Sequence, residues 1–150
     1  MKQKTEMTIR KASVSDIPQI SDIENRLFGD PWTAEQFETV TASQNELLLC
    51  AETEGQIAGY ICMTLVLDQA YIENVAVDVP FRRQGIARKM LDTVCDIARG
   101  KNCPNIVLDV RINNTGARTL YSEYGFKDAA IRRNMYEHPA EDGITMIKEL

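Results

Sequence analysis

One stretch near the middle of the chain constrains the fold more than any other part. Residues 71–77 are rich in β-branched and apolar side chains, which predicts a buried strand. Val79 and Pro80 break this pattern, and from Ile86 onward apolar residues recur at the spacing of one helical face. A basic turn that contains Gly85 separates the two segments. We therefore expect a strand, a basic glycine turn and a helix, in that order.

The basic turn is a candidate site for a phosphate group. The first turn of a helix carries unpaired N–H groups and a partial positive charge, so a loop with little side-chain bulk can lay its backbone against an anion. Gly85 permits that approach, and Arg82, Arg83 and Arg88 add positive charge. The turn matches neither the dinucleotide-binding glycine pattern nor the nucleotide P-loop, which needs a lysine and a hydroxyl. A glycine that serves only helix packing is the alternative.

The length of the chain allows one domain. With 150 residues, 44% of them hydrophobic and 26% charged, the sequence fits a single compact domain over residues 1–150, with residues 1–6 flexible. The formal charge of −5 argues against a general nucleic-acid binder, because such proteins gain affinity by neutralising phosphates. No apolar run is long enough to span a bilayer, and no signal-peptide core follows the first residues. We expect a cytoplasmic protein that binds neither nucleic acid nor membrane, as a monomer or weak dimer.

The cysteines do not indicate a metal site. The four cysteines contain no C-x-x-C pair, and the only histidine, His138, is distant from all of them in the chain. Reduced and mostly buried thiols suit a cytosolic protein. We expect no bound metal.

The segments that flank the central unit predict further strands and helices. Residues 47–52 and 57–63 enclose a glycine-bearing turn, which predicts an antiparallel hairpin. Residues 106–111 predict another buried strand, and a helix is expected from Ala117 to Tyr124. Two helices are expected before the hairpin, each opened by capping residues.

The end of the chain predicts a second hairpin. A strand is expected from Phe126 through residues 131–136, then a polar loop over residues 138–143 and a final strand over residues 144–147. Strands and helices therefore interleave, with hairpins at both ends. This order implies an α/β fold of the α+β kind, with a mixed central sheet flanked by helices.

Three motifs resemble one enzyme family. The segment R-R-Q-G-I-A directly after N-V-A-V-D resembles the acetyl-CoA pyrophosphate loop of the GNAT superfamily of N-acetyltransferases. L-D-V-R-I-N-N at residues 108–114 and A-R-T-L-Y-S-E-Y-G-F at residues 117–126 resemble two further signatures of that superfamily. Within it, D-P-W-T, V-L-D-Q-A and I-R-R-N-M-Y resemble the RimI-type enzymes. The resemblance implies acetyl-CoA as co-substrate and, as acceptor, the N-terminal alanine of a small-subunit ribosomal protein.

The resemblance also implies roles for individual residues. The central strand would present backbone groups to the pantetheine arm and thioester, and the basic turn would surround the pyrophosphate. Tyr121 would donate a proton to the leaving thiolate, a task that a phenol can perform as a general acid; a tyrosine packed in the core is the alternative. The residues implied to bind the cofactor are Val75, Ala76, Val77, Arg83, Gln84, Gly85, Ile86, Ala87, Arg88 and Asn114.

The general base is open at the level of sequence. The RimI-type pattern has glutamate in L-E-V-R, where this chain has Asp109, whose carboxylate is one methylene shorter. Asp109 can act through a water molecule, or Glu73 can substitute, since it shares the parity of Val75 and Val77 along the strand. A purely electrostatic role for both carboxylates is the third option.

The acceptor is expected to be a protein N-terminus. A free α-amino group has a pKa of roughly 7.7–8, so on the order of a tenth is neutral near pH 7, whereas lysine, at about 10.4, is almost fully charged. A short or water-relayed base is therefore sufficient for an N-terminus. Phe28, Trp32 and Tyr136 can line the entry for a peptide, and Glu24 or Glu73 can attract its positive charge. Ordinary packing is the alternative for each of these residues.

Two other functions compete with this one. The first is an acetyltransferase of the same fold that acts on a small-molecule amine. The second is a non-catalytic module that binds acetyl-CoA and has lost the base.

Overall fold

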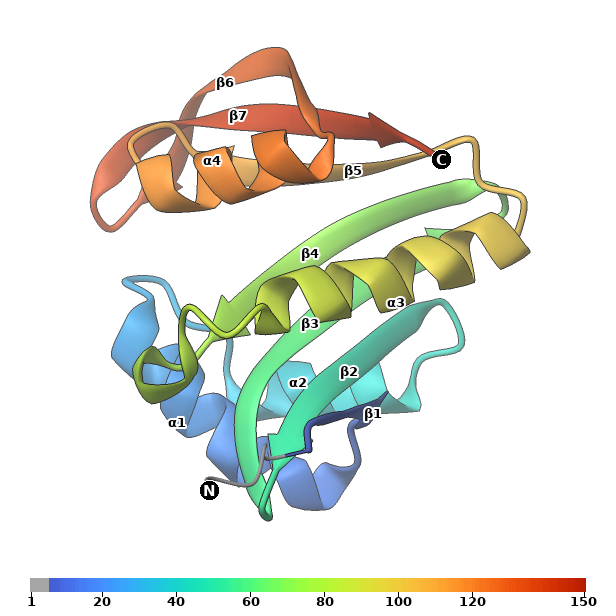
Figure 1. Cartoon of the computed structure of the whole chain (residues 1–150). Coiled ribbons are helices and arrows are strands. Elements are labelled where there is room, and N and C mark those ends of the chain that lie inside the picture. The colour runs from blue at the N-terminus through green and yellow to red at the C-terminus, as the bar shows by residue number, and fades with distance from the viewer. Residues whose placement is uncertain (1–5) are drawn as a thin grey trace, which may run out of the picture.

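The computed structural model describes residues 6–150, so the flexibility expected for residues 1–6 lies outside the described residues except at Glu6, which is exposed. Within the described chain there are seven strands, four α-helices and two short 3-10 helices (Figure 1). In chain order they are β1 (Thr8–Lys11), η1 (Val14–Asp16), α1 (Ile17–Leu27), α2 (Ala34–Ala42), β2 (Glu46–Thr53), β3 (Gln56–Val66), β4 (Gln69–Val77), η2 (Val79–Phe81), α3 (Ile86–Gly100), β5 (Asn105–Arg111), α4 (Thr115–Tyr124), β6 (Lys127–Glu137) and β7 (Ala140–Glu149).

All the strands belong to one sheet with the order β1-β2-β3-β4-β5-β7-β6. Only β4 and β5 run parallel, and every other neighbouring pair is antiparallel. The parallel pair is joined through α3, as a crossover connection requires. The mixed sheet, the β2–β3 and β6–β7 hairpins and the predicted strand–turn–helix unit are all confirmed.

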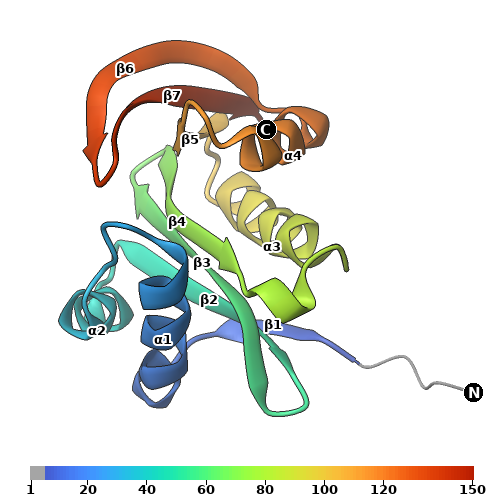
Figure 2. The ribbon, with the colours of Figure 1, turned by 90° about the vertical axis from the view of Figure 1, so that its left-hand side faces the viewer.

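Helices cover both faces of the sheet. Figure 2 shows α1 and α2 on one face, and α3 and α4 on the other. Each helix buries an apolar stripe against the strands, and two separate cores result. Phe37 of α2 meets Tyr60 of β3 edge to face at 5.7 Å in one core, and Leu91 of α3 is fully buried in the other. A side chain of this size contributes about 1.5–3 kcal/mol when it is removed from water.

The sheet opens between β4 and β5. The two strands pair only where Ala70–Ile72 face Ile106–Leu108. Immediately after this short ladder β4 contains a bulge, because Cys62 pairs with Asn74 while the next residue of β3 pairs with Ile72. Beyond the bulge the strands diverge (Figure 1). This opening positions the candidate site.

Local sequence accounts for the helices that border the opening. Gly85 precedes α3 in the left-handed conformation, with φ of 76°, which glycine adopts without steric cost. Asn114 caps α4 by accepting a hydrogen bond from the backbone N–H of Ala117 at 3.2 Å. Gly125 ends α4 with φ of 111°, as a C-terminal glycine commonly does.

The last hairpin differs from the sequence prediction. Residues 138–143 were expected to form a polar loop, but β7 begins at Ala140, and only His138 and Pro139 separate it from β6. Backbone pairing decides this outcome, because Glu141 faces Tyr136 and Gly143 faces Arg132 across the ladder. Polar side chains on this strand do not oppose its formation, since the sheet needs only one apolar face.

All four cysteines are buried and unpaired, as predicted. Among the described helices, none has the length and apolar character needed to cross a membrane.

Candidate active site

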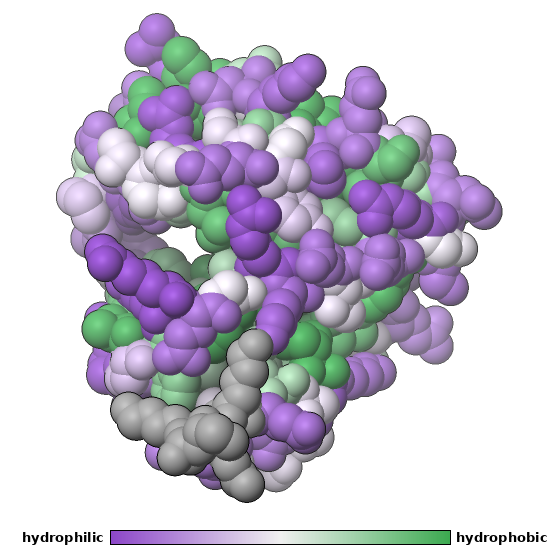
Figure 3. Space-filling model, viewed as in Figure 1, coloured by the Kyte–Doolittle hydropathy of each residue, from purple (hydrophilic) through white to green (hydrophobic). Residues whose placement is uncertain are grey.

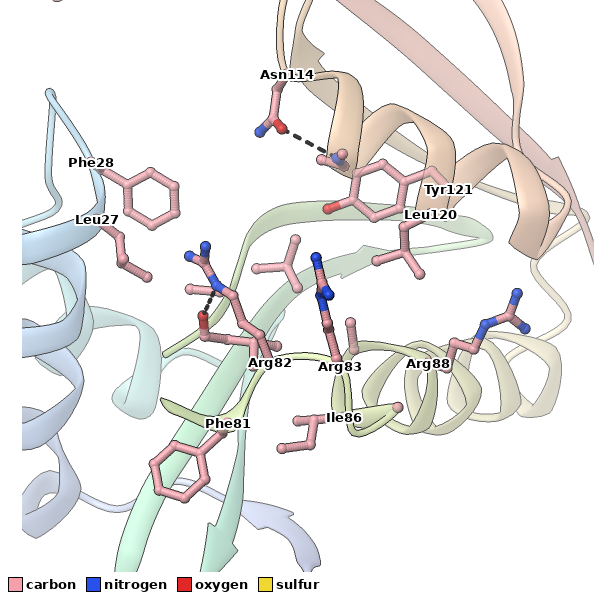
Figure 4. Close-up of a pocket in the computed structure, with 17 residues that line it drawn as sticks. Leu27, Phe28, Phe81, Arg82, Arg83, Ile86, Arg88, Asn114, Leu120 and Tyr121 are labelled. Carbon is pink, nitrogen blue, oxygen red and sulfur yellow. Dashed lines mark hydrogen bonds between the residues drawn. The ribbon is translucent and has the colours of Figure 1, made fainter. Parts of the chain in front are cut away.

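A cleft of about 740 Å³ opens where β4 leaves β5. It lies between the end of β4, the turn before α3 and one side of α4 (Figure 4). The space-filling view shows the surface hollowed on this side of the molecule (Figure 3). Every residue predicted to bind the cofactor lines this cleft except Gln84, whose side chain is exposed outside it.

The turn before α3 presents backbone N–H groups to the cleft. No side chain caps α3, so the N–H groups of its first turn lack intrahelical partners. Gly85 and Arg83 both have positive φ, and the Arg83 side chain projects into the cleft (Figure 4). A Cβ at Gly85 would meet no atom within 4 Å, so backbone conformation and the space in front of it explain the glycine. This arrangement can bind an anionic diphosphate.

The end of β4 forms one wall of the cleft through its backbone. Val75 and Val77 line the cleft, and their strand has no ladder partner on the β5 side beyond Ile72. The Arg82 Nε donates a hydrogen bond to the carbonyl oxygen of Val77 at 3.1 Å. An extended ligand that contains amide groups can therefore pair with β4 as an added strand would.

Tyr121 is a buried residue of α4 that lines the cleft. Its ring is 5% exposed and packs edge to face on Phe126 at 5.8 Å. Its hydroxyl points into the cleft (Figure 4), and the described residues provide no hydrogen-bond partner for it. Burial raises the pKa of this phenol, and the neighbouring phenol of Tyr136 adds to the effect. Tyr121 therefore stays protonated at neutral pH and can donate.

Asn114 lies opposite the turn before α3. Its Oδ1 atom caps α4, so the amide oxygen is already used. The Nδ2 group points away from the helix toward the cleft (Figure 4), where it can donate to a ligand. The sequence motif identified this residue, and its position just before the expected helix also suited it to capping, which the structure shows.

A second cleft of about 480 Å³ meets the first one at Tyr121. Its walls come from the end of α1, the α1–α2 loop, β4, β5 and the β6–β7 turn. Phe28, Trp32 and Tyr136 all line it, so the structure brings the three residues predicted for the acceptor together. The Arg111 guanidinium stacks over the Tyr136 ring at 4.3 Å and fixes it in the wall.

Asp109 lies in the wall of the second cleft with both carboxylate oxygens engaged. The Tyr71 hydroxyl donates to Oδ2, and the Thr145 hydroxyl donates to Oδ1 at 2.5 Å. Arg132 Nε in turn donates to Thr145 at 3.0 Å. No sequence pattern indicated Tyr71 and Thr145, because three strands that are distant along the chain have to meet before these contacts exist. Together they fix the orientation of the carboxylate.

Glu73 also lines the second cleft, but it does not share the side of β4 with Val75 and Val77, contrary to the prediction from strand parity. The bulge in β4 falls at this residue, so Glu73 lies beside Cys62 on the α1 and α2 face, whereas Val75 packs with the opposite core. The expectation of a shared side is therefore wrong. Burial and the neighbouring Glu46 carboxylate raise the pKa of Glu73 to about 7, because both oppose its ionisation. A carboxyl group with such a pKa is suited to proton transfer at neutral pH.

Glu24 anchors the α1–α2 loop to the sheet. Its carboxylate accepts hydrogen bonds from the Tyr60 hydroxyl at 2.6 Å, from Asn74 Nδ2 at 2.9 Å and from the backbone N–H of Trp32 at 2.9 Å. The Trp32 ring packs on Phe37 at 5.3 Å. Trp32 is thus held in the cleft wall by both its backbone and its ring.

The α1–α2 loop meets the β6–β7 turn across the second cleft. Asp30 Oδ1 lies 2.5 Å from His138 Nδ1, and Asp30 Oδ2 accepts the His138 backbone N–H at 3.1 Å. A Cβ at Gly29 would overlap the carbonyl oxygen of His138, so only glycine permits this approach. His138, which showed no metal-binding pattern in the sequence, joins two segments 108 residues apart.

The fold and the site define an acyltransferase of a known class. Residues 17–126 match the family model described as Acetyltransferase (GNAT) family, and this chain belongs to that family. The family resemblance, the enzyme class and the fold expected from the three motifs are thereby confirmed.

The names of the relatives of the chain are more specific than that of the family. It is 34% identical over 138 residues to the ribosomal protein bS18-alanine N-acetyltransferase of Escherichia coli K12, covering 91% of this chain and 90% of the relative. It is 30% identical over 150 residues to the putative enzyme of the same name from Bacillus subtilis 168, covering 95% of each. The crystal structure of the E. coli ribosomal-protein-S18-alanine N-acetyltransferase superposes with a TM-score of 0.87 at 32% identity, covering 96% of this chain and 94% of that chain.

Proposed function

We propose that this chain transfers the acetyl group of acetyl-CoA to the N-terminal α-amino group of a protein. The proposed acceptor is the alanine at the start of a small-subunit ribosomal protein, as the names of its relatives state for those enzymes. One observation carries the proposal: two adjoining clefts meet at the protonated Tyr121. A donor and an acceptor can therefore react at that point.

The first cleft, or cofactor cleft, fits acetyl-CoA. Its diphosphate would lie against the N–H groups of α3 with Arg83 beside them, and the pantetheine amides would pair with β4. The thioester would then reach the junction of the clefts, near Val75. A backbone N–H of β4 directed at the thioester oxygen would stabilise the negative charge that develops during attack.

The second cleft, or acceptor cleft, would hold the acceptor amine beside the thioester. The neutral amine attacks the thioester carbon, a tetrahedral intermediate forms and collapses, and the carbon–sulfur bond breaks. The departing thiolate takes a proton from Tyr121, and the amide nitrogen loses one to the base, so coenzyme A leaves as a thiol. Fixing both reactants in one orientation supplies much of the acceleration.

Two carboxylates compete for the role of base. Asp109 lies in the acceptor cleft, but both of its oxygens accept hydrogen bonds, so a water molecule would have to relay the proton. Glu73 lines the same cleft and has the raised pKa that a base working at neutral pH requires. Either residue suffices for an α-amino group, a part of which is already neutral at pH 7.

A panel of acceptors tests the function. Release of coenzyme A from acetyl-CoA would be measured with a peptide that begins with alanine, the same peptide with an acetylated N-terminus, a peptide whose only amine is a lysine side chain, and a polyamine. We expect turnover with the first peptide alone. Preferred turnover of the polyamine would support the small-molecule alternative instead.

The binding-module alternative predicts a different result. Calorimetry would show saturable binding of acetyl-CoA, and the acceptor panel would show no turnover of any amine. A survey of cellular N-termini that lose acetylation when the chain is removed would then identify the acceptor.

A ribosomal acceptor would put the reaction in the cytoplasm. The expectations of no metal, no nucleic-acid partner and a monomer or weak dimer stay predictions.

A further inference from the structure

Glu24 carries a carboxylate that no cation of the described chain neutralises. The residue is 2% exposed, and its three hydrogen-bond donors are a phenol, an amide and a backbone N–H, all of them neutral. None of the ion pairs between described residues includes it. A buried carboxylate is costly unless it gains a countercharge as well as hydrogen bonds. Such a carboxylate is a candidate binding group for a positively charged ligand.

The carboxylate borders the acceptor cleft. Glu24 lines that cleft together with two of its partners, Trp32 and Asn74. A carboxylate can accept about four hydrogen bonds, and Glu24 accepts three, two of them at Oε1 and one at Oε2. One acceptor position at Oε2 is therefore unused.

The other charged groups of the cleft are already engaged. Asp30 is paired with His138 and lies 3.7 Å from Arg111, whose guanidinium also binds a glutamate and two carbonyl groups of the β6–β7 turn. Asp109 accepts two hydroxyl hydrogens, and Glu73 shares its environment with a second glutamate from β2. Among these described groups, Glu24 combines deep burial, an unused acceptor position and the lack of a cation.

We propose that Glu24 is the countercharge for the α-ammonium group of the acceptor. At neutral pH most protein N-termini are protonated, so the terminus enters the cleft as a cation and binds Glu24 before it loses a proton to the base. This inference rests on the proposed function and names the residue that selects a charged terminus. Glu24 acts in binding, so its loss raises KM for the acceptor more than it lowers kcat.

Two ligands that differ only in the charged group test the proposal. One is a short peptide that begins with alanine, and the other carries a propionyl group in place of that alanine, which removes only the amine. Binding to the complex with coenzyme A, which cannot react, would be measured at about pH 6.5, below the α-amino pKa. For the wild-type protein we expect the alanine peptide to bind roughly tenfold to a hundredfold more tightly, as a charged hydrogen bond allows. In Glu24→Gln the two affinities should become nearly equal.

The design separates binding of charge from a structural role. If Glu24 only holds the α1–α2 loop, Glu24→Gln weakens both ligands by the same factor and leaves their ratio unchanged, which would overturn the inference. Glu38→Gln, an exposed change of the same kind on α2, is the matched control and should keep the wild-type ratio. Failure of the wild-type protein to acetylate the alanine peptide would instead remove the proposed function, and this inference with it.

A measurement on the wild-type protein covers the case in which Glu24→Gln does not fold. The side-chain carboxyl carbon of Glu24 would be followed by nuclear magnetic resonance in ¹³C-labelled protein with coenzyme A bound. The alanine peptide should shift this resonance, and the propionyl peptide should shift it much less. Equal shifts with both ligands would contradict the proposal.

Discussion

At the scale of single residues, the chemistry depends on how burial shifts the pKa of each ionisable side chain. Tyr121 and Glu73 both border the acceptor cleft, and burial holds each in its protonated form to a higher pH than usual. The family motif over residues 117–126 lies mostly on α4, and Tyr121 lines the cleft from that helix. Strand parity predicted Glu73 on the same side of β4 as Val75, and this is wrong because one extra residue in a strand reverses the side to which the following residues point.

Tyr121→Phe should depress turnover while leaving cofactor affinity unchanged. The phenol is the proposed donor to the leaving thiolate, and loss of a general acid lowers rate by roughly 10²–10⁴-fold. Steady-state kinetics would give kcat, and calorimetry would give the dissociation constant of acetyl-CoA. Tyr124→Phe is the matched control, since it removes a phenol from the same helix whose hydroxyl binds Asp92 outside both clefts. Normal turnover in Tyr121→Phe would disprove the acid role.

At the scale of elements, two helix starts and one strand edge form the cofactor cleft. The α3 turn was predictable from the sequence, because a basic glycine segment between a strand and an amphipathic helix has few other structures available. The unpaired edge of β4 was not, because it arises from the short ladder with β5. The hydrogen bonds that the Arg26 guanidinium donates to the Asp78 carboxylate, at 2.8 and 3.1 Å, were not predictable either. They join α1 to the residue that precedes η2.

Gly85→Glu should abolish cofactor binding. The change places bulk and negative charge where the diphosphate would lie, and it forces a residue with a Cβ into the left-handed region, at a cost of roughly 1–2 kcal/mol. Gly55→Glu is the matched control: Gly55 has φ of 78° and open space around it, but it lies in the β2–β3 turn. Both variants should lose similar stability in urea unfolding, and only Gly85→Glu should lose calorimetric binding of acetyl-CoA. Equal binding by the two would contradict the proposed diphosphate site.

At the scale of the whole molecule, the two layers of helices bury separate cores while the sheet opens between them. That opening places carboxylates from different elements in one cavity, and their mutual repulsion enters the stability of the fold. Glu73 and Glu46 lie within 4.8 Å of each other and of the Cys62 sulfur, measured between their nearest ligand-type atoms. Repulsion between the two carboxylates therefore destabilises the fold when both are ionised.

Stability should fall between pH 4.5 and about 7 because of Glu73. Its pKa rises from 4.5 to about 7 on folding, so in that window the folded state holds a proton that the unfolded state has released. This contribution is complete below pH 4.5, is lost as pH rises through 7, and changes no further above that. Glu73→Gln should flatten this part of the curve of unfolding free energy, measured in urea at several pH values. Parallel curves for the two proteins would contradict the assignment.

The activity of the same variant across pH separates the two candidate bases. If Glu73 is the base, kcat/KM of the wild type rises with an apparent pKa near 7, and Glu73→Gln loses that rise. If Asp109 is the base, Asp109→Asn removes the activity and Glu73→Gln retains the profile.

The sequence by itself determined the family, the fold class and the basic glycine turn before α3. These depend on contiguous segments, in which strand alternation, helix periodicity and turn glycines report local backbone preferences. Only the tertiary structure decided the acceptor cleft: the bulge that redirects Glu73, the hydroxyls that hold Asp109 and the burial of Glu24 without a cation. Each of these arises where segments far apart in the chain meet, and the energy of a charge at such a place depends on neighbours that no local pattern specifies.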